Sequence, residues 1–365
     1  MTTTTTKSSQ STKTSDGPTY TPVDGRLLEV DDLHVEFHTQ DGVARAINGV
    51  NMYLDQGETL AVLGESGSGK SVTAQAIMGI LDMPPAKIPK GSIRYCGQDL
   101  LTMPEEQRRK TRGPEISMVF QDALSSLNPV FPVGWQIAEM FRKHRGMNRS
   151  DSLERAVKLM QRVQIPAAKE RVKAYPHQFS GGMRQRIMIA MAIALDPAVL
   201  IADEPTTALD VTIQAQIVDL INRLKDDFDS AVIFITHDLG VIAEIADEII
   251  VMYAGRVVER GSKRDLFYDP QMPYTWGLLG SIPRLDRPRP ERLHTIEGAP
   301  PSLINSPQGC KFRPRCPHAF EKCREEPPLE NRVGTPGHLD RCWLDVEFKR
   351  AHRDDTISGG SVEAA

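Results

Sequence analysis

One glycine-rich segment constrains the fold of this chain more than any other feature. Residues 64–71 read Gly-Glu-Ser-Gly-Ser-Gly-Lys-Ser. They follow Thr59–Leu63, a short apolar run typical of a buried parallel strand, and they precede Val72–Ile80, which has the pattern of a helix. A strand, a glycine-rich turn and a helix in this order predict a phosphate-binding loop in an α/β sheet.

The residue types of this loop suit the binding of a nucleoside triphosphate. Glycines allow backbone N–H groups to converge on the phosphates, and the N-terminus of the following helix adds a partial positive charge. Lys70 is predicted to reach the β- and γ-phosphates, and the Ser71 hydroxyl is predicted to bind Mg²⁺. The alternative is a glycine-rich turn that binds nothing. The predicted cofactors are ATP and Mg²⁺, and the predicted contacts from the loop are Gly64, Ser66, Gly67, Ser68, Gly69, Lys70 and Ser71.

A second buried strand supplies two acids. The run Ala198–Ala202 is apolar and is followed directly by Asp203 and Glu204. Since open α/β sheets bind ligands at the carboxyl ends of their strands, these acids are expected beside the phosphate-binding loop. Asp203 is predicted to hold Mg²⁺, and Glu204 to polarise the attacking water as general base. Alone, such a pair would more often form a solvated turn, but together with the loop it indicates nucleotide hydrolysis.

Four further segments resemble the remaining motifs of ABC ATPases. Phe179–Arg186 resembles the signature motif, Gln121 the glutamine of the Q-loop, Thr207–Asp210 the D-loop, and His237 the switch histidine. Order and spacing agree, and the resemblance covers approximately residues 27–345. It implies an α/β P-loop ATPase fold, with a mixed sheet core, an antiparallel β subdomain and a helical subdomain.

The resemblance also implies roles for these residues. Gln121 would sense Mg²⁺ and the attacking water, and His237 would contact the γ-phosphate. Ser180 begins a helix running to Leu195, and a helix N-terminus favours an anion. In the family this motif caps the ATP of the opposing subunit, so that each ATP lies between two chains. The residues implied for the cap are Ser180, Gly181, Gly182 and Asp210.

The aromatic residue that would stack on adenine is less evident. Phe37 is the nearby candidate, and the alternative is a phenylalanine packed in the core.

A narrower resemblance is to the D-type ATPase subunit of bacterial oligopeptide and dipeptide (peptide/nickel) importers. It rests on Tyr175–Arg186, with Met183 where general signatures have Gln, and on Asp203–Thr212, Tyr268–Pro270 and Pro273–Thr275. It implies a heterodimer with a paralogous F-type ATPase, two transmembrane permease subunits and an extracytoplasmic substrate-binding protein. The chain would then lie on the cytoplasmic face of the membrane. Nickel, oligosaccharide or another solute remains an alternative cargo.

Charge and hydropathy exclude other classes. Lys and Arg total 44 and Asp and Glu total 48, so the net charge of −4 gives no electrostatic footprint for nucleic acid. A soluble ABC ATPase acting on nucleic acid is a remote alternative, but no heptads of a long coiled coil separate Ser71 from Ser180. The longest apolar run, Ile187–Leu195, is far shorter than the roughly 20 residues of a membrane span. Residues 1–21 lack the apolar core of an export signal, which favours a reducing cytosol.

Four of the five cysteines are close together in the sequence, at Cys310, Cys316, Cys323 and Cys342. Structural zinc sites usually contain C-x₂₋₄-C pairs, and no such pair occurs here. Wider spacing suits a larger cluster held by four thiolates. The segment Gly309–Pro317 resembles the one that carries a [4Fe–4S] cluster in peptide importers. Zinc, and unligated or disulfide-bonded cysteines, remain alternatives.

Composition and pattern predict the following organisation. Residues 1–25 are expected to be a disordered tail and 26–262 the nucleotide-binding domain, with a helical subdomain at about 122–196. Residues 263–348 are expected to form a small Cys-rich extension, and 349–365 a flexible tail.

Overall fold

The computed structural model of the chain describes residues 20–207, 209–281 and 295–358. It contains two β-sheets, as the sequence predicts. The first is antiparallel, with strand order β2-β1-β4-β5, and the second has strand order β11-β10-β9-β3-β8-β7-β6. In the second sheet, β6, β7, β8, β3 and β9 are mutually parallel, and β10 and β11 are antiparallel additions. The strands are β1 (Arg26–Thr39), β2 (Gly42–Asp55), β3 (Thr59–Leu63), β4 (Ala86–Tyr95), β5 (Gln98–Asp99), β6 (Ile116–Val119), β7 (Val199–Asp203), β8 (Ala231–Thr236), β9 (Glu248–Tyr253), β10 (Arg256–Ser262) and β11 (Leu339–Asp340).

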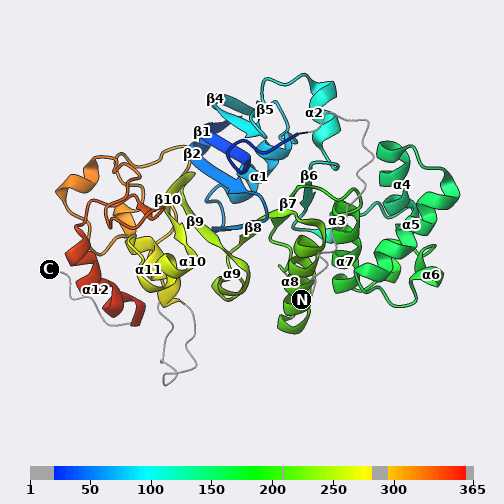
Figure 1. Cartoon of the computed structure of the whole chain (residues 1–365). Coiled ribbons are helices and arrows are strands. Elements are labelled where there is room, and N and C mark those ends of the chain that lie inside the picture. The colour runs from blue at the N-terminus through cyan, green and yellow to red at the C-terminus, as the bar shows by residue number, and fades with distance from the viewer. Residues whose placement is uncertain (1–19, 208, 282–294, 359–365) are drawn as a thin grey trace, which may run out of the picture.

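The helices flank these sheets, and α4 to α6 lie at the opposite end of the molecule from α11 and α12 (Figure 1). The described α-helices are α1 (Lys70–Met78), α2 (Glu105–Thr111), α3 (Ala123–Ser126), α4 (Val133–Arg145), α5 (Arg149–Arg162), α6 (Ala168–Arg171), α7 (Gly181–Ala192), α8 (Val211–Phe228), α9 (Leu239–Ile245), α10 (Lys263–Tyr268), α11 (Pro273–Gly280) and α12 (Val346–Ser358).

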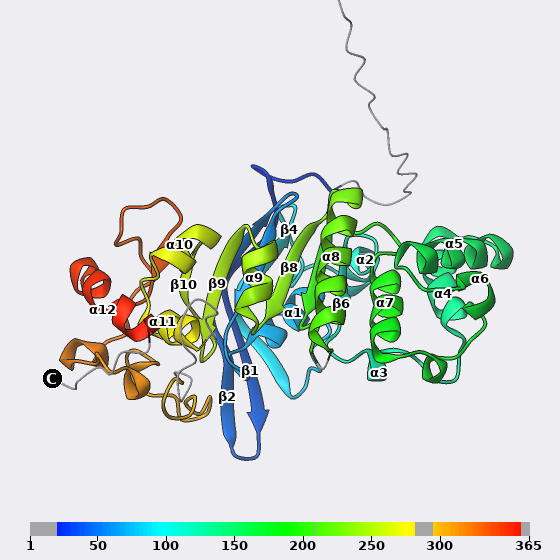
Figure 2. The same cartoon turned by 90° about the horizontal axis from the view of Figure 1, so that it is seen from below.

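The seven-stranded sheet forms the middle layer. Successive side chains of a strand point to opposite faces, so each parallel strand contributes to two cores. In β7, Leu200 and Ala202 face the helical side with α7 and α8, whereas Val199 and Ile201 face α1 and the antiparallel sheet. Figure 2 shows α8 and α9 covering one face of this sheet. Burial on both faces explains why these strands are continuous apolar runs.

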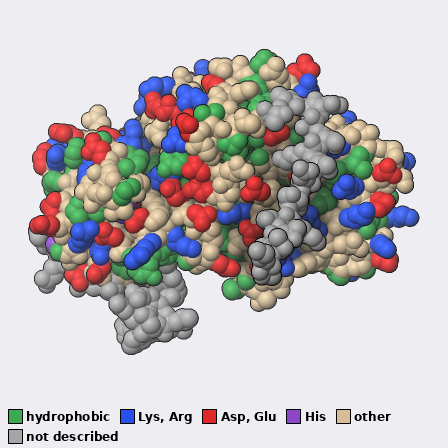
Figure 3. All heavy atoms as spheres, in the orientation of Figure 1, with side chains coloured by type: hydrophobic (Ala, Val, Ile, Leu, Met, Phe, Trp, Pro, Cys, Tyr) green, Lys and Arg blue, Asp and Glu red, His purple; other side chains and the backbone are tan. Residues whose placement is uncertain are grey.

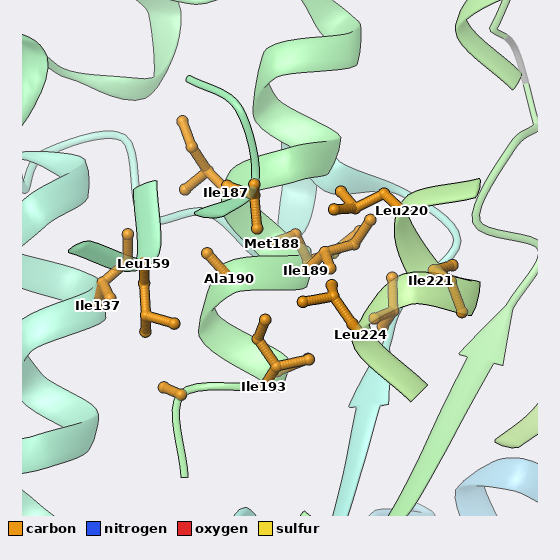
Figure 4. Close-up of a cluster of buried hydrophobic side chains, with 14 of the residues drawn as sticks. Ile137, Leu159, Ile187, Met188, Ile189, Ala190, Ile193, Leu220, Ile221 and Leu224 are labelled. Atoms are coloured by element: carbon orange, nitrogen blue, oxygen red, sulfur yellow. The ribbon is translucent and has the colours of Figure 1, made fainter. Parts of the chain in front are cut away.

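The helix α7 is buried between the helical subdomain and the sheet. Ile187, Met188, Ile189 and Ala190 are each at most 4% exposed, and Figure 4 shows them between α4 and α5 on one side and α8 on the other. The second half of α7, residues 187–192, is apolar all round, and such a segment must be surrounded by protein. The helix ends at Ala192 instead of the predicted Leu195.

The C-terminal segment, predicted as a small Cys-rich extension, is built into the fold of the nucleotide-binding part. Its strand β11 pairs with β10 and so extends the main sheet. Its Phe312 and Cys342 belong to the same apolar core as Leu63 of β3. The extension therefore shares its core with the nucleotide-binding part, because its short segments bury too little apolar surface by themselves.

Both predicted tails include residues that are ordered in the structure. The prediction of a flexible 349–365 is wrong for its first ten residues, because α12 runs to Ser358 and packs against α11. At the other end, the Tyr20 ring lies 5.3 Å from the Tyr95 ring, within the predicted disordered residues 1–25. Residues 1–19 and 359–365 lie outside the described residues.

A half-buried carboxyl before β3, that of Glu58, predicts a pH-dependent stability. Burial raises the pKa of Glu58 from 4.5 to about 7. Its folded pKa lies above its unfolded value, so its stabilising contribution is complete below about pH 4.5 and is lost as the pH rises to about 7. Glu58→Gln should therefore stabilise the chain at about pH 8, by on the order of 1 kcal/mol because solvent screens this half-buried group, and have little effect near pH 4.

Urea unfolding of wild type and variant at both pH values measures this difference. The matched control is Glu106→Gln, at a side chain that is 86% exposed. Equal effects of Glu58→Gln at the two pH values would contradict the prediction.

Candidate nucleotide site

The loop between β3 and α1 has a backbone that only glycine permits at two positions. A Cβ at Gly64 would lie 2.3 Å from the carbonyl oxygen of Met252. Gly69 has a φ of +106°, and a Cβ there would lie 2.7 Å from the carbonyl oxygen of Ala46. The loop is thus wedged between β2 and β9, with its amides at the N-terminus of α1.

Lys70 begins α1 and is folded back over the loop. Its Nζ donates hydrogen bonds to the carbonyl oxygens of Gly64, at 2.8 Å, and Glu65, at 3.0 Å. Burial lowers the pKa of this ammonium, and the nearby carboxylates, of which Glu204 contributes most, oppose that shift. The lysine is held beside the loop at the place where the sequence predicts phosphates.

Ser71 and Asp203 meet as predicted from their positions after β3 and β7. The Ser71 hydroxyl donates to Oδ1 of Asp203 at 3.0 Å, and Asp203 is 3% exposed. Burial raises the pKa of this carboxyl, whereas the hydrogen bond from Ser71 lowers it. A hydroxyl and a carboxylate in contact are a donor set that suits Mg²⁺ with phosphate oxygens.

Glu204 lies at the centre of three other predicted residues. Its Oε2 accepts hydrogen bonds from Gln121 Nε2, at 3.1 Å, and from the Thr207 hydroxyl, at 2.9 Å. The ring nitrogen Nδ1 of His237 is 3.6 Å from the same oxygen. Glu204 has a φ of +45°, a conformation uncommon outside glycine and often found at functional sites. Three segments far apart in the sequence, around Gln121, Glu204 and His237, therefore converge on one carboxylate.

The signature residues and Asp210 of the D-loop lie at the N-termini of α7 and α8. Ser180 N-caps α7 and accepts a hydrogen bond from the Met183 amide, and Gly181 is exposed beside it. Asp210 N-caps α8 and accepts from the Ile213 amide at 2.9 Å. The two helix N-termini are adjacent, because a Cβ on Gly182 would lie 2.8 Å from the Ile213 side chain. The helix α7 packs on α3, α4, α5 and β6, whereas α1 packs on β2, β6 and β7.

Phe37 lies near the end of β1, paired with Ala44 of β2 and Ala86 of β4. It is partly buried against the core of the antiparallel sheet. Its role in binding adenine stays a prediction.

Comparison with known proteins decides the family. Residues 47–207 match the family described as ABC transporter, and residues 258–323 match the family described as oligopeptide/dipeptide transporter, C-terminal region. The oligopeptide transport ATP-binding protein OppD of Salmonella typhimurium is 52% identical over 321 residues, which are 88% of this chain and 94% of that protein. The chain belongs to the ABC transporter ATP-binding proteins. The resemblance inferred from the motifs is thereby confirmed.

Other relatives agree at the levels of sequence and fold. The dipeptide transport ATP-binding protein DppD of Lactococcus lactis is 51% identical over 87% of this chain and 91% of that protein. A dimeric structure of the ATP-binding cassette MJ0796 with ADP and phosphate has a TM-score of 0.59 and 25% identity, covering 65% of this chain and 99% of that one. CbiO1 from Clostridium perfringens has a TM-score of 0.56 and 27% identity, covering 67% and 92%. The ABC ATPase fold is thus established.

Within this ABC protein, the four clustered cysteines line a single cavity. Cys310, Cys316, Cys323 and Cys342 all contribute to it, together with His318 and other side chains of the extension. None of these four cysteines, all within the described residues, forms a disulfide. Within the described ranges, no group of three or more His, Cys, Asp or Glu side chains is arranged so that it could hold a metal ion. The remaining cysteine, Cys96, is buried as a small apolar residue.

Sequence reasoning missed a set of contacts between the ATP-binding loop and the extension. Arg315 forms a bidentate ion pair with Glu65, and the Tyr274 hydroxyl accepts a hydrogen bond from the Glu65 amide at 2.9 Å. The sequence shows Glu65 in the loop and Arg315 between two cysteines. It does not predict that the two residues pair, because 250 residues separate them.

In the part of the chain that the structure describes, no helix is both long and apolar enough to cross a membrane.

Proposed function

We propose that the chain is the ATP-hydrolysing subunit of an ABC importer for dipeptides or oligopeptides, on the cytoplasmic face of the membrane. The supporting observation is the near-complete coverage of relatives named as oligopeptide and dipeptide transport ATP-binding proteins, at about 50% identity. The match of residues 258–323 to the C-terminal region of such transporters supports the same conclusion.

ATP binding follows from the loop. The loop amides, the N-terminus of α1 and Lys70 together bind the β- and γ-phosphates, with Ser66, Gly67, Ser68 and Gly69 forming the cradle. Ser71 and Asp203 hold Mg²⁺, which when bound offsets phosphate charge. Phe37 stacks on the adenine.

Hydrolysis is assigned to the residues around Glu204. Glu204 accepts the proton of the attacking water, and Gln121 holds the same carboxylate and orients that water. His237, next to this carboxylate, contacts the γ-phosphate. Thr207 fixes the carboxylate through its hydroxyl, 2.9 Å away, so the base is oriented before ATP arrives.

The second half of the site comes from another chain. The cap residues Ser180, Gly181, Gly182 and Asp210 are proposed to close over the ATP held by a paralogous F-type ATPase, whose own cap closes over this chain's loop. ATP binding then closes the heterodimer and hydrolysis opens it. Two permease subunits transmit this movement, and an extracytoplasmic binding protein delivers the peptide.

Nucleic acid is not the proposed partner. On the face seen in Figure 3, Lys and Arg side chains are interspersed with Asp and Glu and form no continuous basic stripe.

Reconstitution tests the function. The chain, its permeases and its partner ATPase are placed in vesicles, with the binding protein on the other side, and uptake of di- and oligopeptides is compared with that of nickel and oligosaccharides. ATP-dependent accumulation of peptide is expected. Accumulation of nickel or sugar without peptide would overturn the cargo, and uptake without ATP would overturn the ATPase role.

We also propose that the four-cysteine cavity holds a [4Fe–4S] cluster. Two observations support it: the four thiols line one cavity, and their spacing lacks the short pairs typical of zinc. The thiols would have to move together to ligate the cluster, because within the described residues no three of them are placed to hold a metal ion. A cluster there would stabilise the extension by joining the segments that carry the four cysteines.

Anaerobic purification tests this assignment. The expected product is brown, with iron and sulfide at about four each per chain, and Cys316→Ser should lose the colour. The matched control is Cys96→Ser, which should keep it. A colourless protein with one bound zinc, or with four freely alkylated thiols, would refute the cluster.

A further inference from the structure

The ATP-binding loop is held in place by the C-terminal extension at Glu65. Both carboxylate oxygens of Glu65 accept hydrogen bonds from the Arg315 guanidinium, at 2.6 and 3.0 Å. The Glu65 amide donates to the hydroxyl of Tyr274, in α11, at 2.9 Å. Thus the second residue of the loop is bound through both its side chain and its backbone.

The Arg315 side chain is 4% exposed and is fixed on all sides. Its remaining N–H groups donate to the carbonyl oxygens of Ile296 and Glu297, at 3.2 and 2.9 Å, and to the Tyr253 hydroxyl at 3.4 Å. A planar guanidinium with every donor used is a rigid partner for a carboxylate. Arg315 cannot swing away without leaving several of these groups unpaired.

A cluster of three aromatic rings next to Arg315 joins the extension to strand β9. The rings of Tyr253, Tyr274 and Phe312 pack against one another, with centroids 4.6 to 5.4 Å apart. Phe312 immediately precedes the short helical turn Arg313–Arg315. The turn and the loop are therefore joined by both an ion pair and an apolar cluster.

The charge of Glu65 explains why such a clamp is needed. A carboxylate in a loop that binds a triphosphate would repel the phosphates if its charge were not compensated. We propose that Arg315 is a positioning residue through which the extension neutralises Glu65 and sets the affinity of the loop for ATP. This inference rests on the proposed function only in that ATP is the ligand of the loop.

Nucleotide binding to the full-length chain tests the proposal, with ATP, ADP and adenosine as probes. Arg315→Ala should weaken ATP binding by on the order of tenfold, weaken ADP binding less and leave adenosine binding unchanged, because repulsion grows with ligand charge. Adding Glu65→Gln to Arg315→Ala should restore ATP affinity to within about twofold of wild type, because the repelling charge is gone. The matched control is Arg324→Ala, an arginine of the extension that is 70% exposed, which should bind all three ligands as wild type does.

A purely structural role for the pair gives different results. It predicts a loss of ATP affinity that Glu65→Gln does not restore in the double variant, because a displaced loop stays displaced whatever the charge at residue 65, and that result would overturn the proposal. If Arg315→Ala does not fold, Glu65→Gln alone decides: the proposal expects tighter ATP binding, whereas weaker binding would refute it. If wild type binds no ATP, the proposed function fails as well, whereas equal ATP binding by wild type and Arg315→Ala overturns this inference alone.

Discussion

Replacing Glu204 by Gln is expected to stop ATP hydrolysis while leaving ATP binding intact. The amide is nearly isosteric, so its oxygen can still accept hydrogen bonds from Gln121 and Thr207, but it cannot take a proton from water. General-base catalysis is worth about 10²–10⁴-fold, so kcat should fall by at least about 100-fold. The KM for ATP should change by less than about threefold, since the groups that bind the phosphates are untouched. Peptide uptake driven by this chain should fall with kcat.

Steady-state phosphate release by the assembled importer measures the fall in kcat. Nucleotide binding by the same preparation measures whether ATP binding is kept. The matched control is Glu244→Gln, at an exposed carboxyl on α9, which should hydrolyse ATP as wild type does. Unimpaired hydrolysis or uptake in Glu204→Gln would show that the base lies elsewhere.

The convergence on Glu204 could be predicted from sequence because each motif has a local signal. The strand β3 runs from Thr59 to Leu63, as its apolar run predicts, and Asp203 at the end of β7 meets Ser71 at the same sheet edge. These placements follow from strand polarity and motif order alone. The position of each motif can therefore be predicted from the residues directly beside it in the sequence.

The attachment of the extension could not be predicted in the same way. The pairing of Arg315 with Glu65 and of β11 with β10 joins residues distant in the chain, and no local periodicity specifies either contact. The residues after 348 are largely polar, so composition alone indicates a solvated tail. Only the tertiary structure shows that one of these polar residues, Lys349, is completely buried.

Lys349→Met should therefore strongly destabilise a segment that the sequence alone would leave unstructured. Lys349 Nζ donates to Oδ1 of Asp340 at 2.7 Å, and both side chains are 0% exposed. Without Lys349 the buried Asp340 carboxylate keeps only Arg332, whose Nη1 is 3.4 Å from Oδ1, and breaking a buried pair in this way costs up to about 3–5 kcal/mol. The extension should then unfold at lower urea, as reported by Trp276 and Trp343.

Two further variants separate charge from packing in this effect. In Lys349→Met combined with Asp340→Asn neither charge of the pair remains, so the double variant should be more stable than Lys349→Met alone. Arg350→Ala is the matched control, because this neighbour on α12 is 53% exposed and its surface pair with Asp269 is worth at most about 1 kcal/mol. A small loss in Lys349→Met, similar to that of Arg350→Ala, would mean that α12 is not anchored through the buried pair. A large loss that Asp340→Asn does not relieve would assign the cost to packing, since the uncompensated carboxylate would no longer be present.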